Sequence, residues 1–184
     1  MVEASSKFQD SLPVSSDALL ETLKRWSISY KLFEHVPLRT VADSKKVEGI
    51  FISTQNGGGH VKNLYLRDKK KKNILLVAEQ DQAIDLKRLS KNLNFSNLSF
   101  GSPERLMQNL GVRPGAVTPL SMINGVNNNV SLFMDKALRN KIVIYVHPLV
   151  NDRTIEMTLE NLEKFLAISV LTLKRVSSII SGLI

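Results

Sequence analysis

Apolar residues recur with the three- and four-residue spacing of amphipathic helices in several segments of the chain. The first such segment predicts a helix that Ser15 or Ser16 caps and that ends near Trp26. The sequence SPE at positions 102–104 is typical of a helix start, because serine caps, proline fits the first turn and glutamate suits the positive end of the helix. Gly111 marks the end of that helix.

Three further helices follow from the same reasoning. Residues 86–93 form a short apolar-periodic segment, and Thr158 is placed to cap a final helix with an apolar stripe. Thr40 opens a shorter helix, with Asp43 three residues on as a capping box.

Alternation of apolar and polar residues predicts strands. Two of these, at 61–67 and 73–78, are joined by a turn at 68–72 and form a hairpin. The segment VEGIFIS fits a strand or a helix end, and the QNGGGH that follows it is interpreted as a flexible loop. The predicted strands are 28–33, 61–67, 73–78, 130–134, 141–146 and 154–157.

Helices and strands alternate without a regular βαβ order, so we expect an α+β domain with a mixed, mostly antiparallel sheet. The length of 184 residues fits one domain with a sizeable core. We predict a flexible N-terminal arm at 1–14, a single domain at 15–170 and a C-terminal extension at 171–184.

The composition narrows the kinds of site and partner. The chain has no cysteine, which excludes disulfides, thiolate catalysis and cysteine-ligated metals. Its net charge of +8 favours a polyanionic partner such as nucleic acid, although a basic protein without such a partner is an equal alternative. The N-terminus lacks the pattern of a signal peptide, and the apolar run at 165–173 is too short to span a membrane. We expect a cytoplasmic protein without a membrane partner.

Basic residues cluster in one predicted turn. This turn contains four consecutive lysines, Lys69, Lys70, Lys71 and Lys72. Such a run is usually a solvent-exposed turn without a binding role. If they and other lysines share one face, they are suited to contact nucleic-acid phosphates without reading sequence. The further candidates for such a face are Lys45, Lys46, Lys62, Lys87, Arg88 and Lys91.

Lys62 lies in the first strand of the predicted hairpin, on the face of Leu64 and Leu66. A lysine on an apolar face either extends to water at the strand end or lines a pocket. The preceding glycines, which allow a ligand to approach the backbone, and the strand-averse Asn63 favour a pocket. There Lys62 would act as a cation for a phosphate or a carbonyl oxygen.

Gly115 follows a proline in a turn signal and can adopt a backbone conformation that other residues avoid. Free N–H groups at such a turn are able to stabilise an oxyanion, but a plain connecting turn has the same signature.

Three histidines are present, and none has metal-site spacing. His147 and His35 each follow a predicted strand, where catalytic or capping side chains both occur. His60, in the glycine loop, is the weakest candidate. The chain has no phosphate-binding loop, dinucleotide fingerprint or nucleophile elbow, so an enzyme here would position a water and stabilise charge.

Five segments in order resemble the YbaK/ProX-type family of free-standing aminoacyl-tRNA editing domains, in its prolyl-tRNA deacylase branch. They cover most of residues 16–168 and read FEHVPLRTV, GGGHVKNLYLRDKKKKNILLV, IDLKRL, FGSPERLMQNLGVRPGAVTPL and HPLVNDRTI. The resemblance implies a barrel-like sheet surrounded by helices. The segment before Gly57 and the residues after Val170 depart from the family pattern.

The resemblance also implies site roles. Lys62 matches a lysine expected to hold the phosphate of the terminal adenosine, and residues 115–119 match a loop whose backbone contacts substrate. Lys62, Gly115 and His147 are therefore the expected catalytic residues. The expected substrate-binding residues are Thr40, Asn63, Ala116, Thr118, Pro119, Asn151 and Thr154, the residues expected at the tRNA backbone are Lys45, Lys46, Lys69, Lys70 and Lys71, and no metal or cofactor is expected.

The implied reaction is hydrolysis of the ester of mischarged tRNA(Pro), with alanine favoured. A ribose hydroxyl of the substrate would help a water to attack, without a covalent intermediate. The alternatives are a deacylase for Cys-tRNA(Pro) and a non-catalytic module that binds tRNA or a nucleotide. Contact with prolyl-tRNA synthetase or an elongation factor, and a monomeric or dimeric state, are left open.

Overall fold

The computed structural model describes residues 3–38, 40, 43 and 47–172. Its strands are β1 (Lys31–Glu34), β2 (Gly58–Arg67), β3 (Asn73–Glu79), β4 (Ser99–Phe100), β5 (Val130–Met134), β6 (Val143–Val146) and β7 (Arg153–Met157). Its α-helices are α1 (Ser16–Arg25), α3 (Leu86–Asn92), α4 (Pro103–Leu110), α5 (Met122–Gly125) and α6 (Leu159–Thr172). The short 3₁₀ helices are η1 (Ser6–Ser11), η2 (Glu48–Ile50), η3 (Thr54–Asn56), η4 (Pro119–Ser121) and η5 (Lys136–Asn140).

One mixed sheet runs through the molecule in the order β1-β7-β6-β2-β3-β5, and β4 also pairs with β2. The β2–β6 and β3–β5 pairs are parallel, and the other four pairs are antiparallel. This confirms the predicted α+β class and the mixed, mostly antiparallel sheet. The path ends at β1 and β5 without joining them, so the expected barrel-like shape holds only loosely.

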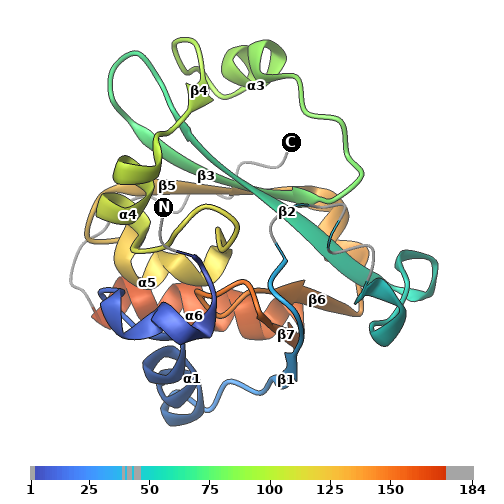
Figure 1. The fold of residues 1–184 in the computed structure, drawn as a ribbon. Helices are drawn as coiled ribbons and strands as arrows, with labels where there is room; N and C mark the ends of the chain where they lie inside the picture. Colours follow the sequence, from blue (N-terminus) through green and yellow to red (C-terminus); the bar gives the residue numbers. More distant parts are fainter. Residues whose placement is uncertain (1–2, 39, 41–42, 44–46, 173–184) are drawn as a thin grey trace.

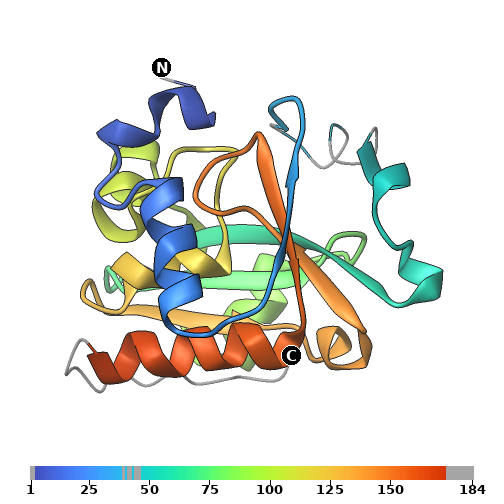
Figure 2. The ribbon, with the colours of Figure 1, turned by 90° about the horizontal axis from the view of Figure 1, so that it is seen from below.

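Two apolar clusters lie on opposite faces of the β2–β3 hairpin. On β3, Leu75 and Val77 belong to the larger cluster, whereas Ile74 and Leu76 belong to the smaller one. Helices α1, α4 and α6 cover the larger cluster, and α3 covers the smaller. Figure 1 shows α3 and α6 on the two sides of the hairpin, and Figure 2 shows α1 beside α6.

Helices with strong local signals begin and end where the sequence predicts. The Ser15 side chain accepts a hydrogen bond from the Ala18 N–H at the start of α1. Ser102 caps α4 in the same way, and Gly111 ends that helix with a left-handed φ of 67°. The Thr158 hydroxyl accepts from the Asn161 N–H at the start of α6.

The strand predictions hold less evenly. β5 has the predicted bounds, while β1 and β6 begin later than residues 28 and 141. Thr40 and Asp43 form the predicted capping box, since each backbone N–H donates to the other side chain. The helix that this box would open extends into residues outside the described part of the chain.

The three glycines before Lys62 are not the predicted flexible loop. Gly57 ends η3 with a left-handed φ of 94°, and β2 already begins at Gly58. A Cβ at Gly58 would lie 1.8 Å from the Ile52 carbonyl oxygen, and one at Gly59 would lie 2.8 Å from the Ile144 side chain. These glycines therefore allow close packing within the protein, and that reason depends on contacts which the local sequence does not reveal.

Residues 3–14 also differ from the predicted flexible arm. They contain η1, and Ala4, Ser5 and Leu12 are buried. The Ser6 N–H and hydroxyl donate to the Asp152 carboxylate at 2.8 and 2.7 Å. This long-range contact is absent from any local pattern, which is why the sequence alone suggested an arm.

Within the described residues, no helix is both long and apolar enough to cross a membrane.

The packing at Gly58 leads to a test of the fold. We expect Gly58→Ala to lower the free energy of unfolding by about 1–3 kcal/mol, the usual cost of overpacking, because a backbone carbonyl is in the way. Urea unfolding monitored by circular dichroism would measure this as a lower midpoint. Gly49→Ala is the matched control, since a Cβ there meets nothing within 4 Å. Equal midpoints for the two variants would contradict the packing argument.

Candidate functional site

The turn between β6 and β7 brings His147 and Thr154 together. The Nδ1 of His147 lies 2.8 Å from the Arg153 carbonyl oxygen and 3.4 Å from the Thr154 hydroxyl. Leu149, within this turn, has a φ of 68°, a left-handed conformation that leucine rarely adopts. Such strain is often found at functional sites, where the surrounding structure holds it in place.

His35 approaches the same threonine from the end of β1. Its Nδ1 lies 2.8 Å from the Val36 carbonyl, and its Nε2 lies 2.8 Å from the Thr154 hydroxyl. A carbonyl only accepts hydrogen bonds, so in the neutral ring Nδ1 carries the proton and Nε2 accepts from the threonine. The rings of His35 and His147 are 6.2 Å apart, and Thr154 is hydrogen-bonded to the first and close to the second.

His147 is held in its neutral form. Burial, together with a smaller effect of the nearby His35, lowers its pKa from 6.5 to about 4, although the bond to the Arg153 carbonyl acts in the opposite direction. Because Nδ1 donates to that carbonyl, Nε2 is the nitrogen with a lone pair. A neutral imidazole with this tautomer is able to accept a proton from a water or a hydroxyl.

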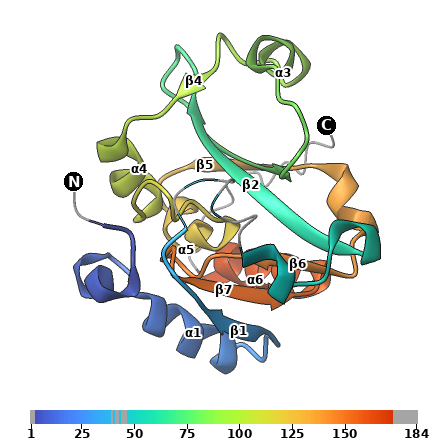
Figure 3. The same ribbon diagram turned by 45° about the vertical axis from the view of Figure 1, so that its right-hand side comes forward.

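A small cavity of about 50 Å³ lies beside His147. It forms where two strands part, because β2 pairs with β6 only from Gly58 to His60 and with β4 only at Leu66 and Arg67. Figure 3 shows β1, β6 and β7 near the N-terminal end of β2. The lining residues are Leu38, Phe51, His60, Val61, Asn63, Gln80, Tyr145, Val146, His147 and Thr154.

Two features of this cavity bear on what it binds. With a volume of about 50 Å³, the cavity accommodates a group of only a few heavy atoms. The Asn63 side-chain oxygen is buried and has no hydrogen-bond partner within the described structure. A buried acceptor of this kind carries a free-energy cost that a bound donor would relieve.

Aromatic side chains form one wall of the cavity. His60 stacks on Tyr145 with ring centroids 4.9 Å apart, and its Nε2 lies 2.9 Å from the Ile52 carbonyl. The Tyr145 hydroxyl donates to Glu156 at 2.6 Å, and burial together with this carboxylate raises the pKa of Tyr145 to about 12. His60, which was placed in a flexible loop by the sequence, is thus a buried wall residue of β2.

Lys62 does not line this cavity. It shares a face of β2 with Leu64 and Leu66, and its ammonium donates to the Gln82 carbonyl. That carbonyl belongs to the rim of a larger cavity of about 280 Å³ under α3. Two carboxylates in its lining already accept backbone hydrogen bonds, as Asp85 caps α3 and Asp135 caps η5.

The loop at residues 115–119 is likewise absent from the lining of the small cavity. Gly115 has a φ of 92°, which confirms the unusual conformation expected of it. Ala116 and Thr118 are fully buried. The Thr118 hydroxyl accepts from the Leu120 N–H and so caps η4, which gives it a structural role.

The remaining predicted site residues are dispersed. Asn151 is buried, with its side-chain oxygen unpartnered in the described structure, and its N–H donates to the Ala4 carbonyl. Thr40 is exposed and bonded to Asp43. Lys69, Lys70 and Lys71 are exposed in the hairpin turn, whereas Lys45 and Lys46 lie outside the described residues.

The structure adds residues that the sequence did not indicate. Gln80 and Phe51 line the cavity but belong to no quoted segment, Leu38 lies in FEHVPLRTV without an assigned role, and Tyr145 lies within a predicted strand. The only signal in the sequence that could have indicated one of these residues is that Tyr145 lies two positions before His147. Among the residues that the structure describes, no group of three or more acidic or histidine side chains is arranged to hold a metal.

Known proteins are similar to this chain in sequence or in fold. The family model of the aminoacyl-tRNA editing domain matches residues 35–165. The prolyl-tRNA editing protein ProX of Acetoanaerobium sticklandii is 36% identical over 151 residues, which cover 82% of this chain and 89% of that protein. Prolyl-tRNA synthetase associated domain-containing protein 1 of Danio rerio is 32% identical over 151 residues, which cover 80% of this chain and 79% of that one.

A solved structure described as a proposed trans-editing enzyme for prolyl tRNA synthetase has a TM-score of 0.63 at 18% identity. The match covers 83% of this chain and 92% of that chain, and it shows a shared fold.

The neutral state of His147 predicts how stability depends on pH. Because its pKa is about 4 in the fold and 6.5 otherwise, the unfolded chain binds the proton first as the pH falls. We expect a stabilisation on the order of 3 kcal/mol that is complete above pH 6.5 and lost as the pH falls to 4. His147→Gln should remove this part of the pH dependence.

Urea unfolding of both proteins at several pH values between 4 and 7 would measure the effect. The same slope of unfolding free energy against pH in wild type and His147→Gln would show that His147 is not buried in its neutral form.

Proposed function

The chain belongs to the aminoacyl-tRNA editing domain family, and we propose that this deacylase acts in trans on mischarged tRNA(Pro), with alanine as the favoured amino acid. The small cavity beside neutral His147 is the observation that supports the proposal most directly. The similarity to a protein named as a prolyl-tRNA editing protein supports the choice of tRNA.

Size is the basis of the proposed selectivity. A synthetase site built for proline excludes the smaller alanine poorly, because each missing methylene changes binding by only about 1–3 kcal/mol. A second site that is too small for the proline ring completes the selection. A cavity of about 50 Å³ is suited to the methyl group of alanine.

The lining also agrees with hydrolysis by an attacking water. Among the described residues it contains imidazoles, amides and hydroxyls, but no thiol, carboxylate or amine that would serve as a strong nucleophile. The Nε2 of His147 is the group that would hold the water or the free ribose hydroxyl of the substrate. The water attacks the ester carbonyl, the ribose oxygen leaves with a proton, and alanine and intact tRNA are released.

Lys62 is proposed to hold a phosphate of the terminal adenosine outside this cavity. Its ammonium now donates to the Gln82 carbonyl, and a phosphate would replace that neutral acceptor with a charged one, which gives the stronger bond. The backbone of Gly115 and its loop is proposed to contact the substrate. The exposed Lys69, Lys70 and Lys71 are proposed to contact tRNA phosphates.

The proposed selectivity predicts an order of substrates. We expect the purified protein to deacylate Ala-tRNA(Pro) fastest, Cys-tRNA(Pro) more slowly, and Pro-tRNA(Pro) at least about tenfold more slowly than the alanyl substrate. Parallel assays of the three substrates would measure this. Loss of proline as fast as alanine would contradict selection by size. Tight binding of all three without hydrolysis would identify a binding module instead.

The proposed role of Lys62 predicts a specific loss. We expect Lys62→Ala to lower kcat/KM for Ala-tRNA(Pro) by about 100-fold, as removal of a preorganised charge contact does, while the unfolding midpoint stays unchanged. Lys164→Ala is the matched control, because Lys164 also donates to a backbone carbonyl, that of Ser27, but far along the chain on α6. If the two variants had equal activities, the proposed role of Lys62 in substrate binding would be wrong.

A further inference from the structure

The orientation of His147 depends on the position of one backbone carbonyl. Its Nδ1 lies 2.8 Å from the Arg153 carbonyl oxygen, and this bond sets which ring nitrogen carries the proton. The Asn151 and Asp152 carbonyls, just before it in the turn between β6 and β7, accept from the Leu38 and His35 N–H groups. Arg153 itself pairs with Glu34, so β1 and the residues after it hold one side of this turn. Whatever fixes residues 151–153 therefore also fixes the imidazole.

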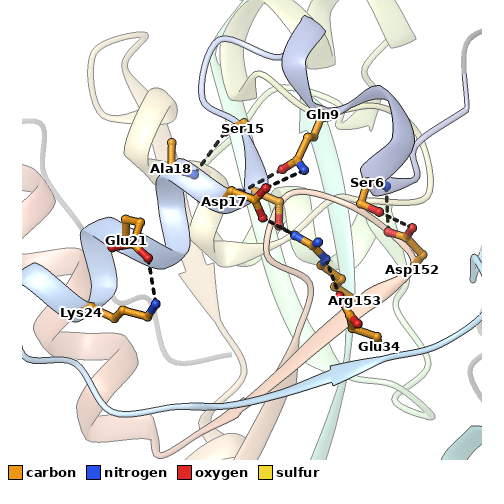
Figure 4. Close-up of polar contacts among 11 residues, drawn as sticks. Ser6, Gln9, Ser15, Asp17, Ala18, Glu21, Lys24, Glu34, Asp152 and Arg153 are labelled. Atoms are coloured by element: carbon orange, nitrogen blue, oxygen red, sulfur yellow. Dashed lines mark hydrogen bonds and ion pairs between the residues drawn. The ribbon is translucent and has the colours of Figure 1, made fainter.

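The N-terminal segment contacts all three of these residues. We call residues 4–17 the N-terminal brace. The Asn151 N–H donates to the Ala4 carbonyl at 2.9 Å. Ser6 donates its N–H and its hydroxyl to the Asp152 carboxylate. Figure 4 shows this pair and, next to it, the side chain of Arg153 directed toward α1.

Arg153 carries the strongest of these links. Its Nη1 lies 2.5 Å from Asp17 Oδ1, and its Nε makes an ion-pair contact with Glu34 at 3.3 Å. The Arg153 side chain is only 16% exposed, whereas Asp17 is 63% exposed. The carboxylate of Asp17 is itself held by Gln9, whose amide donates to Asp17 Oδ2 at 2.9 Å. The hydrogen bond to Arg153 lowers the pKa of Asp17, which keeps the pair charged.

The brace also reaches the loop that contains Gly115. Arg113 donates to the Ser11 hydroxyl at 2.5 Å and to the Phe8 carbonyl at 3.3 Å. The Arg113 carbonyl accepts from the Ala116 N–H, within the same turn as Gly115. One segment therefore holds the elements of two of the three predicted catalytic residues, His147 and Gly115, although these elements are distant in sequence.

We propose that the N-terminal brace positions the site, with Arg153 as the positioning residue that holds the carbonyl bonded to His147. This role rests on the proposed function for its effect on catalysis. The match to the family model begins at residue 35, so the brace lies outside the matched region. Neither Arg153 nor Asp17 lines the small cavity, so both act through His147.

The test compares two carboxylates of α1 that differ in what they contact. Asp17 pairs with Arg153 at 2.5 Å, whereas Glu21 pairs with Lys24 of the same helix at 2.7 Å. Both are exposed, and each variant, Asp17→Ala or Glu21→Ala, removes one negative charge from one ion pair. Asp17→Asn is a milder second variant that keeps the shape of the side chain.

Two quantities would be measured for the full-length proteins. The first is kcat and KM for Ala-tRNA(Pro), well below the unfolding temperature. The second is the ¹⁵N shift of each ring nitrogen of His147, which reports the tautomer and its hydrogen bond without any substrate.

We expect Asp17→Ala to lower kcat about three- to tenfold with KM unchanged, because a small displacement of a catalytic group is costly. The ¹⁵N signals of His147 should move in this variant and in Asp17→Asn. Glu21→Ala should change neither quantity. Equal effects of the two alanine variants, or a loss of kcat with unmoved His147 signals, would overturn the proposal. A wild type that does not deacylate would refute the proposed function. The ¹⁵N signals would still show whether the N-terminal brace positions His147.

Discussion

The alternation of side chains along β2 is the constraint that organises this structure. β2 pairs with β3, β4 and β6, and its successive side chains point to opposite faces of the sheet. Lys62 and Asn63, which are adjacent in sequence, therefore point to opposite faces: Asn63 lines the small cavity, and Lys62 donates to the Gln82 carbonyl outside it. A substrate that touches both must lie across the edge of β2, in the stretch between its pairings with β6 and β4.

This arrangement separates the binding of a small uncharged group from the binding of an anion. The small cavity, with neutral His147 and buried Asn63, is suited to an uncharged group of a few atoms. Lys62, outside that cavity, is suited to an anion. An aminoacylated adenosine carries both parts, a small amino acid on one side of the ribose and a phosphate on the other. The separation of the Lys62 ammonium from the small cavity thus matches the separation of the phosphate from the aminoacyl group in the proposed substrate.

Local signals were sufficient to predict some elements and insufficient for others. α4 was predicted because its cap, proline and terminal glycine all lie within ten residues and act through neighbouring backbone groups. The resemblance of the segment HPLVNDRTI predicted His147 and Thr154 as site residues, and both line the cavity. His35, by contrast, meets Thr154 from 119 residues away, and no local pattern indicates that hydrogen bond.

Gly58 and residues 3–14 are cases in which a local pattern led to a wrong prediction. Glycine in a polar stretch suggests a loop, and a serine-rich N-terminus suggests an arm, because local propensity is weak evidence for either. Gly58 lies within a strand because the Ile52 carbonyl leaves no room for a side chain. Ser6 is ordered because Asp152 accepts two hydrogen bonds from it. Both reasons are tertiary contacts, which arise only when the chain is folded.

The central claim is that the cavity beside His147 receives the amino acid. The most direct test is a titration with adenosine that carries alanine through an amide in place of the ester, followed by NMR of the labelled protein. The account predicts that shifts concentrate at His147, Asn63 and Thr154, and that the proline analogue produces none there. Shifts confined to α3 and residues 82–85, with His147 unmoved, would contradict it.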